Sequence, residues 1–111
     1  MTTRINRYSV VKTGVVVHTT NTSSTEIDFS EFAGGTVMVP GGGSAIGAIT
    51  FEVAEKNGGT YVGLEASGGA AVSITSEIGK AYALPDELFG ANHFRMIAAS
   101  NATTCIVNLK G

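Results

Sequence analysis

The feature that most constrains the fold of this chain is a two-residue alternation of apolar and polar side chains in "AITFEVAE", residues 48–55. Ile49, Phe51 and Val53 fall on one side of an extended backbone, and small or polar residues fall on the other. A helix would instead need apolar residues every three to four positions. The segment is therefore predicted to be a strand with one buried face.

A second alternating segment, "TYVGLEA", follows after a short interval. The alternation places Val62 and Leu64 inward, with Tyr61 and Glu65 outward. Between the two segments lies the sequence Asn-Gly-Gly at 57–59, whose residue types accept positive φ angles at low cost. The two strands are therefore expected to form a β-hairpin.

Seven further short segments have the same period or a β-rich composition. They are residues 8–17, 26–29, 36–39, 72–75, 81–84, 93–96 and 104–109. Short strands with turn residues every 8 to 12 positions are typical of two packed sheets. We predict an all-β fold, an antiparallel β-sandwich of about nine short strands, either jelly-roll or immunoglobulin-like in its strand order.

The chain is expected to form a single sandwich domain over residues 1–111, because no linker or low-complexity run divides it. One helical turn at most is predicted, in "LPDELFGA" near residues 85–90. Pro85 would occupy the first helical position, two acidic residues would follow in the first turn, and Gly90 would end it.

Charge is sparse in this sequence and unevenly placed. Charged residues make up 14% of the chain and the net charge is −2, so no basic face for nucleic acid is expected. Arg4, Arg7 and Lys12 nevertheless all precede the first acidic residue, Glu26. Residues 1–7 are thus either a solvated terminus or an extended arm that lies on an acidic partner surface.

The single cysteine, Cys105, alternates with Val107 and Leu109 and is predicted to be a buried small hydrophobe. It has no partner in the chain for a disulfide or a metal pair. No segment approaches the roughly 18 to 20 apolar residues of a membrane span, so no membrane partner is expected. The amino-terminal segment lacks the apolar core of a secretory signal, which predicts synthesis in the cytoplasm.

The glycine-rich stretch "VPGGGSAIGAITFEV", residues 39–53, has some features of a nucleotide-binding loop. Gly42 and Gly47 have the spacing of a phosphate-binding loop, but Ala48 and Ile49 stand where lysine and a hydroxyl residue are required. A dinucleotide loop would need a helix after the glycines, and the period here predicts a strand. The stretch is predicted to be a connection between strands.

A small, uncharged loop of this kind can lie flat against a neighbouring protein. Gly41, Gly42, Gly43 and Ser44 are therefore candidate partner-binding residues, together with the basic residues Arg4, Arg7 and Lys12.

No catalytic, cofactor-binding or metal-binding residues are predicted. His18 and His93 have no nucleophile or acid nearby in sequence, so each is interpreted as a structural histidine on the surface. Two carboxylate pairs leave calcium open as an alternative, although the dense oxygen spacing of a dedicated loop is absent. These pairs are Asp28 with Glu31, in the segment "DFSEF" that also holds the expected core residues Phe29 and Phe32, and Asp86 with Glu87.

Residues 26–111 resemble small β-rich structural proteins of tailed bacteriophages. The resemblance is carried by "DFSEFAGGTVMVP", "ITFEVAEKNGGTYVGLEASGGAAVSI", "GKAYALPDELFGANHFRMIA" and "TTCIVNLKG", with "YALPDELFGA" the most distinctive piece. These are framework motifs rather than catalytic ones.

The resemblance implies a non-enzymatic virion protein, a head decoration or cement subunit that binds the outer capsid lattice and joins neighbouring capsomers. Its partners would be the major capsid protein and neighbouring virion subunits, with association into a homo-oligomer and a place on the capsid surface. Deletion of residues 2–7 would then weaken capsid binding and leave the fold intact. The alternatives are a tail or head-to-tail connector component, a carbohydrate-binding module of the virion, and a small enzyme.

Overall fold

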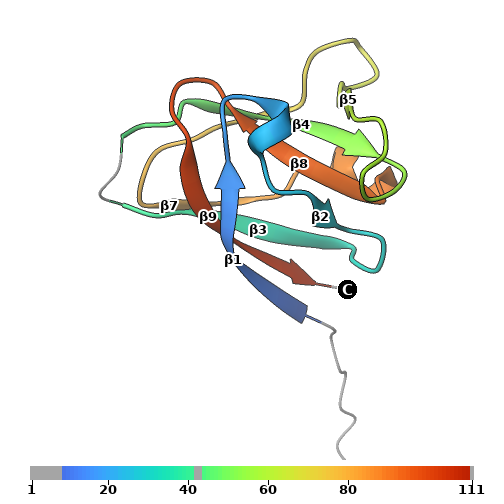
Figure 1. Cartoon of the computed structure of the whole chain (residues 1–111), viewed down its shortest axis with the longest axis horizontal. Helices are drawn as coiled ribbons and strands as arrows, with labels where there is room; N and C mark the ends of the chain where they lie inside the picture. The colour runs from blue at the N-terminus through green and yellow to red at the C-terminus, as the bar shows by residue number, and fades with distance from the viewer. Residues whose placement is uncertain (1–8, 42–43, 111) are drawn as a thin grey trace, which may run out of the picture.

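The computed structural model describes residues 9–41 and 44–110, and within these ranges the chain forms nine strands and two 3₁₀ turns (Figure 1). The strands are β1 (Ser9–Val17), β2 (Ile27–Asp28), β3 (Gly34–Val39), β4 (Ala48–Ala54), β5 (Val62–Gly63), β6 (Ser73–Thr75), β7 (Lys80–Ala83), β8 (His93–Ala98) and β9 (Thr103–Lys110). The turns are η1 (Asn21–Ser23) and η2 (Asp86–Gly90). The predicted arm, residues 1–7, and the predicted contact residues Gly42 and Gly43 lie outside the described residues.

The strands form two antiparallel sheets that pack as a sandwich, which confirms the predicted fold class. We call the sheet with strand order β1-β9-β3-β7 sheet A, and the sheet with order β2-β8-β4-β5 sheet B. The short strand β6 pairs with Ala48–Thr50 of β4, and β5 pairs with Glu52 and Val53. Because β8 pairs with residues 49–54 of β4, β5 and β6 share the other edge of that strand.

The strand order is that of a jelly roll. The chain changes sheet at each step from β1 to β4, stays in sheet B for β5 and β6, and changes sheet again at each step to β9. An immunoglobulin-like sandwich keeps its first two strands together in one sheet, whereas β1 and β2 lie in different sheets here. Taking β5 and β6 as one interrupted strand gives the eight strands of a jelly roll.

The core lies between the sheets and is centred on three phenylalanine rings, two from β4 and β8 of sheet B and one from the residue that follows β2. The ring of Phe94 meets that of Phe29 edge to face at 5.4 Å and that of Phe51 at 6.2 Å. Phe29 is buried as predicted, and Phe32 stacks on it at 6.4 Å from a half-buried position. The sheet A side of the core comes from alternate residues of β1, β3 and β9, namely Val15, Val17, Val37, Val39, Cys105, Val107 and Leu109.

Several local predictions are confirmed. Cys105 is buried, and the segment after the glycine-rich stretch is the strand β4 rather than a helix. The β4–β5 hairpin turns at Gly58, whose φ of 72° is in the region that favours glycine. The helical turn is the 3₁₀ turn η2, with Pro85 one position earlier than expected, as its extended amino-terminal flanking residue.

The burial predicted for Tyr61 and Val62, at the start of β5, is wrong. Val62 lies opposite Val53 and so shares its face, yet the side chain is 58% exposed, because sheet A does not cover this edge of sheet B. Val53 and Val62 instead line a pocket of about 640 Å³ beside the end of η2. The alternation predicts that Tyr61 faces solvent clearly, but it is half-buried and its hydroxyl is inaccessible to water.

Candidate functional site

The outer side of sheet A is a broad surface of mostly apolar and small side chains, which we call the sheet A face. Its residues alternate along each strand with the buried residues of the core, and the pairing aligns them in rows across the sheet. One central row is Val11, Asn108, Thr36 and Ala83, and another is Ile106, Met38 and Ala81. Lys110, opposite Ser9 and Gly34, adds a positive charge at one end of this face. Val11 and Met38 are 59% and 45% exposed, so large apolar side chains face water on this surface.

One end of the sheet A face is hollowed into an apolar groove of about 380 Å³ between β3 and β7. Met38, Ile106 and Ala81 contribute to its lining from three strands, and Pro40 and Gly41 extend it beyond β3. Lys80 also lines this groove. We call this feature the β3–β7 groove.

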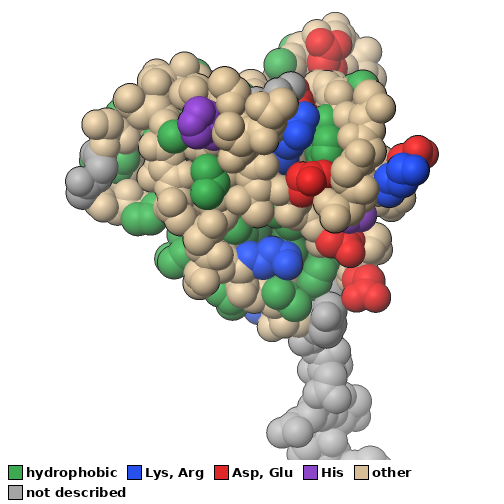
Figure 2. All heavy atoms as spheres, in the orientation of Figure 1, with side chains coloured by type: hydrophobic (Ala, Val, Ile, Leu, Met, Phe, Trp, Pro, Cys, Tyr) green, Lys and Arg blue, Asp and Glu red, His purple; other side chains and the backbone are tan. Residues whose placement is uncertain are grey.

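The charges of the described residues are segregated between the two sheets. The four strands of sheet A carry three lysines, Lys12, Lys80 and Lys110, and no carboxylate. All nine acidic residues of the chain lie elsewhere in the described ranges. Figure 2 shows most of the charged side chains in this view gathered on the right, over β2, β4 and β5, and an almost uncharged surface on the left.

The predicted partner-binding residues are only partly brought together. Gly41 lines the β3–β7 groove, and Ser44 is exposed but is not part of that lining. Lys12 lies opposite the buried residue Val107 and therefore points to the inner side of sheet A, where its charge acts on Asp28 of β2. Lys12 is thus not part of the sheet A face, and Arg4 and Arg7 lie outside the described residues.

The edge strands of sheet A are protected against pairing with a strand of another chain. The sheet A face is therefore the surface better suited to contact another protein. Near the carboxyl end of β1, the backbone N–H of Val16 donates to Thr25 Oγ1 at 2.9 Å, and the N–H of Thr25 donates to the Val16 carbonyl at 3.0 Å. The register of β1 against β9 also shifts between Lys12 and Val15. Bulges, lysines and short edge strands of this kind discourage strand addition.

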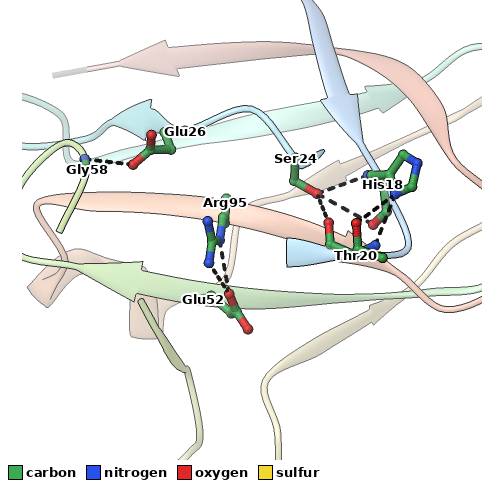
Figure 3. Close-up of polar contacts among 7 residues, drawn as sticks. All are labelled: His18, Thr20, Ser24, Glu26, Glu52, Gly58 and Arg95. Atoms are coloured by element: carbon green, nitrogen blue, oxygen red, sulfur yellow. Dashed lines mark hydrogen bonds and ion pairs between the residues drawn. The ribbon is translucent and has the colours of Figure 1, made fainter. Parts of the chain in front are cut away.

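The outer side of sheet B carries a compact polar cluster (Figure 3). Arg95 of β8 donates through Nε to Glu52 Oε1 of β4 at 3.0 Å, and its guanidinium carbon lies 3.9 Å from the centre of the Tyr61 ring. Glu26 Oε1 accepts the backbone N–H of Gly58 at 3.0 Å. The cluster joins β2, β8, β4 and the β4–β5 turn. We therefore interpret these side chains as residues that stabilise the fold.

Tyr61 and Glu26 influence each other within this cluster. The Tyr61 hydroxyl makes no well-formed hydrogen bond, but it lies close enough to the Glu26 carboxylate for each group to shift the pKa of the other. Burial, together with that carboxylate, raises the pKa of Tyr61 well above its usual range. Tyr61 and the Gly58 N–H lower the pKa of Glu26.

This shift predicts a pH-dependent signal at the β4–β5 turn. Because the folded-state pKa of Glu26 is lowered, its contact with Gly58 is fully present above the unfolded pKa and is lost as pH falls through the folded pKa. The Gly58 amide proton resonance should therefore titrate with a midpoint below the ordinary glutamate value of about 4.3. Two-dimensional NMR measures this, and Glu26→Gln should abolish the titration. A midpoint at or above the ordinary value would contradict the assignment.

The two histidines, His18 and His93, are both partly buried. His18 follows β1, and its Nδ1 accepts the backbone N–H of Thr20 at 3.1 Å, while its own backbone N–H donates to Ser24 Oγ at 3.0 Å (Figure 3). His93 is half-buried rather than fully outward, and its Nδ1 has no hydrogen-bond partner among the described residues. Burial raises the pKa of the Cys105 thiol to about 11, so this cysteine is a poor nucleophile at neutral pH.

Within residues 9–41 and 44–110, no group of three or more His, Cys, Asp or Glu side chains is placed to hold a metal ion. In the same part of the chain, no helix has the length and apolar character that a membrane crossing requires. Comparison with protein-family models, curated proteins and solved structures found no match to this chain.

Proposed function

We propose that this protein is a non-enzymatic structural subunit of a bacteriophage virion, a decoration or cement protein that binds the outer capsid lattice through the sheet A face. The observation that carries the proposal is the sheet A face itself, which exposes Val11 and Met38 on a surface without carboxylates. Large apolar side chains exposed on one face of a small domain are typical of a protein contact.

Three further features support this role. The sandwich is held by a continuous aromatic and aliphatic core, so the face is presented by a stiff scaffold. Jelly rolls occur among virion and lectin domains, which favours the proposal by analogy of fold. Residues 26–111, which carry the phage-protein resemblance, contain β2 to β9 and therefore three of the four strands of sheet A.

A role in carbohydrate binding is the alternative that the structure weakens. Such sites usually present an exposed aromatic ring as a platform for the sugar. Tyr61, the aromatic residue that the sequence offers for this purpose, is half-buried and carries the Arg95 guanidinium against its ring. The ring is thus already engaged within the polar cluster of sheet B.

Co-sedimentation with assembled phage heads tests the proposal. The wild-type protein should pellet with the heads, and Thr36→Asp should reduce its affinity at least about tenfold, because a charge would be buried at the centre of the sheet A face. Ser73→Asp, on exposed β6 of sheet B, is the matched control and should bind normally. Equal binding of both variants, or a wild-type protein that stays in the supernatant, would count against the proposal.

A further inference from the structure

The β4–β5 turn contains Asn57 and Gly58, the only Asn-Gly pair in the chain. An asparagine before glycine is chemically labile, because glycine has no side chain to hinder attack of its backbone nitrogen on the asparagine side chain. Both residues are exposed, and a Cβ atom at Gly58 would meet nothing within 4 Å. Neither burial nor crowding by other segments therefore protects this pair.

The reaction open to such a pair is deamidation through a succinimide. The Gly58 backbone nitrogen loses its proton to solvent and bonds to Asn57 Cγ, while the bond from Cγ to Nδ2 breaks and ammonia leaves. Water then opens the ring. Cleavage at Cγ yields aspartate, whereas cleavage at the main-chain carbonyl carbon yields isoaspartate, whose backbone runs through the former side chain. Water is the only reactant required, and nothing is oxidised or reduced.

The conformation of the turn opposes ring closure. The backbone N–H of Gly59 donates to the Lys56 carbonyl at 3.0 Å, and Gly58 has a φ of 72°. Because none of the described residues other than glycine has a positive φ, residues 56–59 form a type II turn. At the ψ angle of about +120° that this turn type has at its second residue, the Gly58 nitrogen is turned away from the Asn57 side chain. The peptide between Asn57 and Gly58 must therefore rotate before the ring can close.

Glu26 holds that peptide in place. Its Oε1 accepts the Gly58 N–H at 3.0 Å, from a residue that lies far from the turn in sequence (Figure 3). Tyr61 and the Gly58 N–H lower the pKa of Glu26, so its carboxylate is charged at neutral pH. Rotation of the peptide would direct the Gly58 N–H away from this carboxylate and break a charge-assisted hydrogen bond.

From this geometry we infer that Asn57 is a latent deamidation site, and that Glu26 restrains its conversion to aspartate and isoaspartate by holding the Gly58 N–H. Glu26 acts here as a positioning residue for the turn. The inference concerns the chemical lifetime of the folded chain, so it goes beyond the proposed function and does not depend on capsid binding.

Conversion of Asn57 would loosen one end of sheet B. Isoaspartate adds a carbon to the backbone of the turn, so the type II geometry is lost. Either product places a new carboxylate next to the peptide that Glu26 holds, and like charges repel there. Gly58 and Gly59 also line the pocket beside η2, so the shape of that pocket would change with the turn.

Incubation of the purified protein in neutral buffer, followed by peptide mapping with mass spectrometry, tests the restraint. Asn57 in the folded wild-type protein should convert at least about tenfold more slowly than in the same chain unfolded in urea, where neither the turn nor the Glu26 contact persists. Glu26→Ala should speed conversion in the folded protein about three- to tenfold, the effect of one hydrogen bond that no longer has to be broken. Equal rates for the folded wild-type protein and Glu26→Ala would overturn the inference.

Three controls identify the cause of a faster reaction. Glu26→Gln keeps an oxygen that can accept the Gly58 N–H but carries no charge, so its rate should lie between those of the wild-type protein and Glu26→Ala. Asn57→Gln should abolish the mass change in this peptide, because the longer side chain closes a ring much more slowly. Gly35→Ala destabilises sheet A without touching the turn, and it should convert within about twofold of the wild-type rate because the folded state still predominates. An acceleration in Gly35→Ala equal to that in Glu26→Ala would assign the effect to global unfolding and overturn the inference.

Discussion

Replacement of Phe94 by alanine lowers the free energy of unfolding by about 3 to 5 kcal/mol, the largest effect expected from a single truncation in this chain. Phe94 is fully buried in β8, and its ring contacts those of Phe29 and Phe51 at the centre of the core. Truncation removes the transfer free energy of the ring and leaves a cavity that the neighbouring packed rings cannot close by small shifts.

Urea denaturation followed by fluorescence or circular dichroism measures this change, since a domain of this size is expected to unfold in two states. Val62→Ala is the control, because it also shortens an apolar side chain but at a position that is 58% exposed. Its effect should stay within about 0.5 kcal/mol. Comparable losses for the two variants would mean that the core is not centred where the structure places it.

Gly35→Ala is the second substitution with a large expected effect, a loss of about 1 to 3 kcal/mol. A Cβ atom at Gly35 would overlap the carbonyl oxygen of Asn108, which belongs to the neighbouring strand β9. That carbonyl cannot move aside easily, because β9 is paired on both sides within sheet A, with β1 and β3. The strain must therefore be relieved by separating β3 from β9.

The adjacent residue supplies a matched comparison. Gly34 also lies in β3, but a Cβ atom there would meet nothing within 4 Å. Gly34→Ala should be neutral or slightly stabilising, because alanine restricts the unfolded chain more than glycine does. Thermal unfolding of both variants checks the pair. Equal melting temperatures for Gly34→Ala and Gly35→Ala would contradict the close approach of β3 and β9.

Much of the fold follows from local pattern. The strand β9 alternates without interruption, and Cys105, Val107 and Leu109 are all buried as that alternation requires. Glycine residues signal the turn of the β4–β5 hairpin, and Gly58 does adopt a positive φ. Such features are predictable because the period of a strand and the backbone freedom of glycine are properties of a few adjacent residues.

The errors arise where burial depends on what lies opposite a strand. The pattern assigns Val62 to the inner side of sheet B correctly, but it carries no information on whether sheet A extends over that edge. The same alternation places Tyr61 outward, whereas its ring is covered by Arg95 from another strand. These contacts join segments far apart in sequence, so local periodicity cannot reveal them.

The candidate site is predictable only in part for the same reason. Gly41 is identified as a contact residue from its loop, and it lines the β3–β7 groove. The other walls of the groove come from β7 and β9, and their proximity depends on the strand order of the jelly roll. Once strands are assigned, one feature of the sequence could have indicated the sheet A face. The four segments that form sheet A contain no carboxylates.

The orientation of the bound protein on phage heads tests the central claim most directly. Electron cryomicroscopy of heads with and without the purified protein gives a difference map into which the sandwich can be placed. The proposal predicts density on the outer surface of the shell, with the row through Val11, Thr36 and Ala83 against the capsid and the polar cluster of sheet B facing away. Density with sheet B against the shell, or no added density at saturating protein, would contradict it.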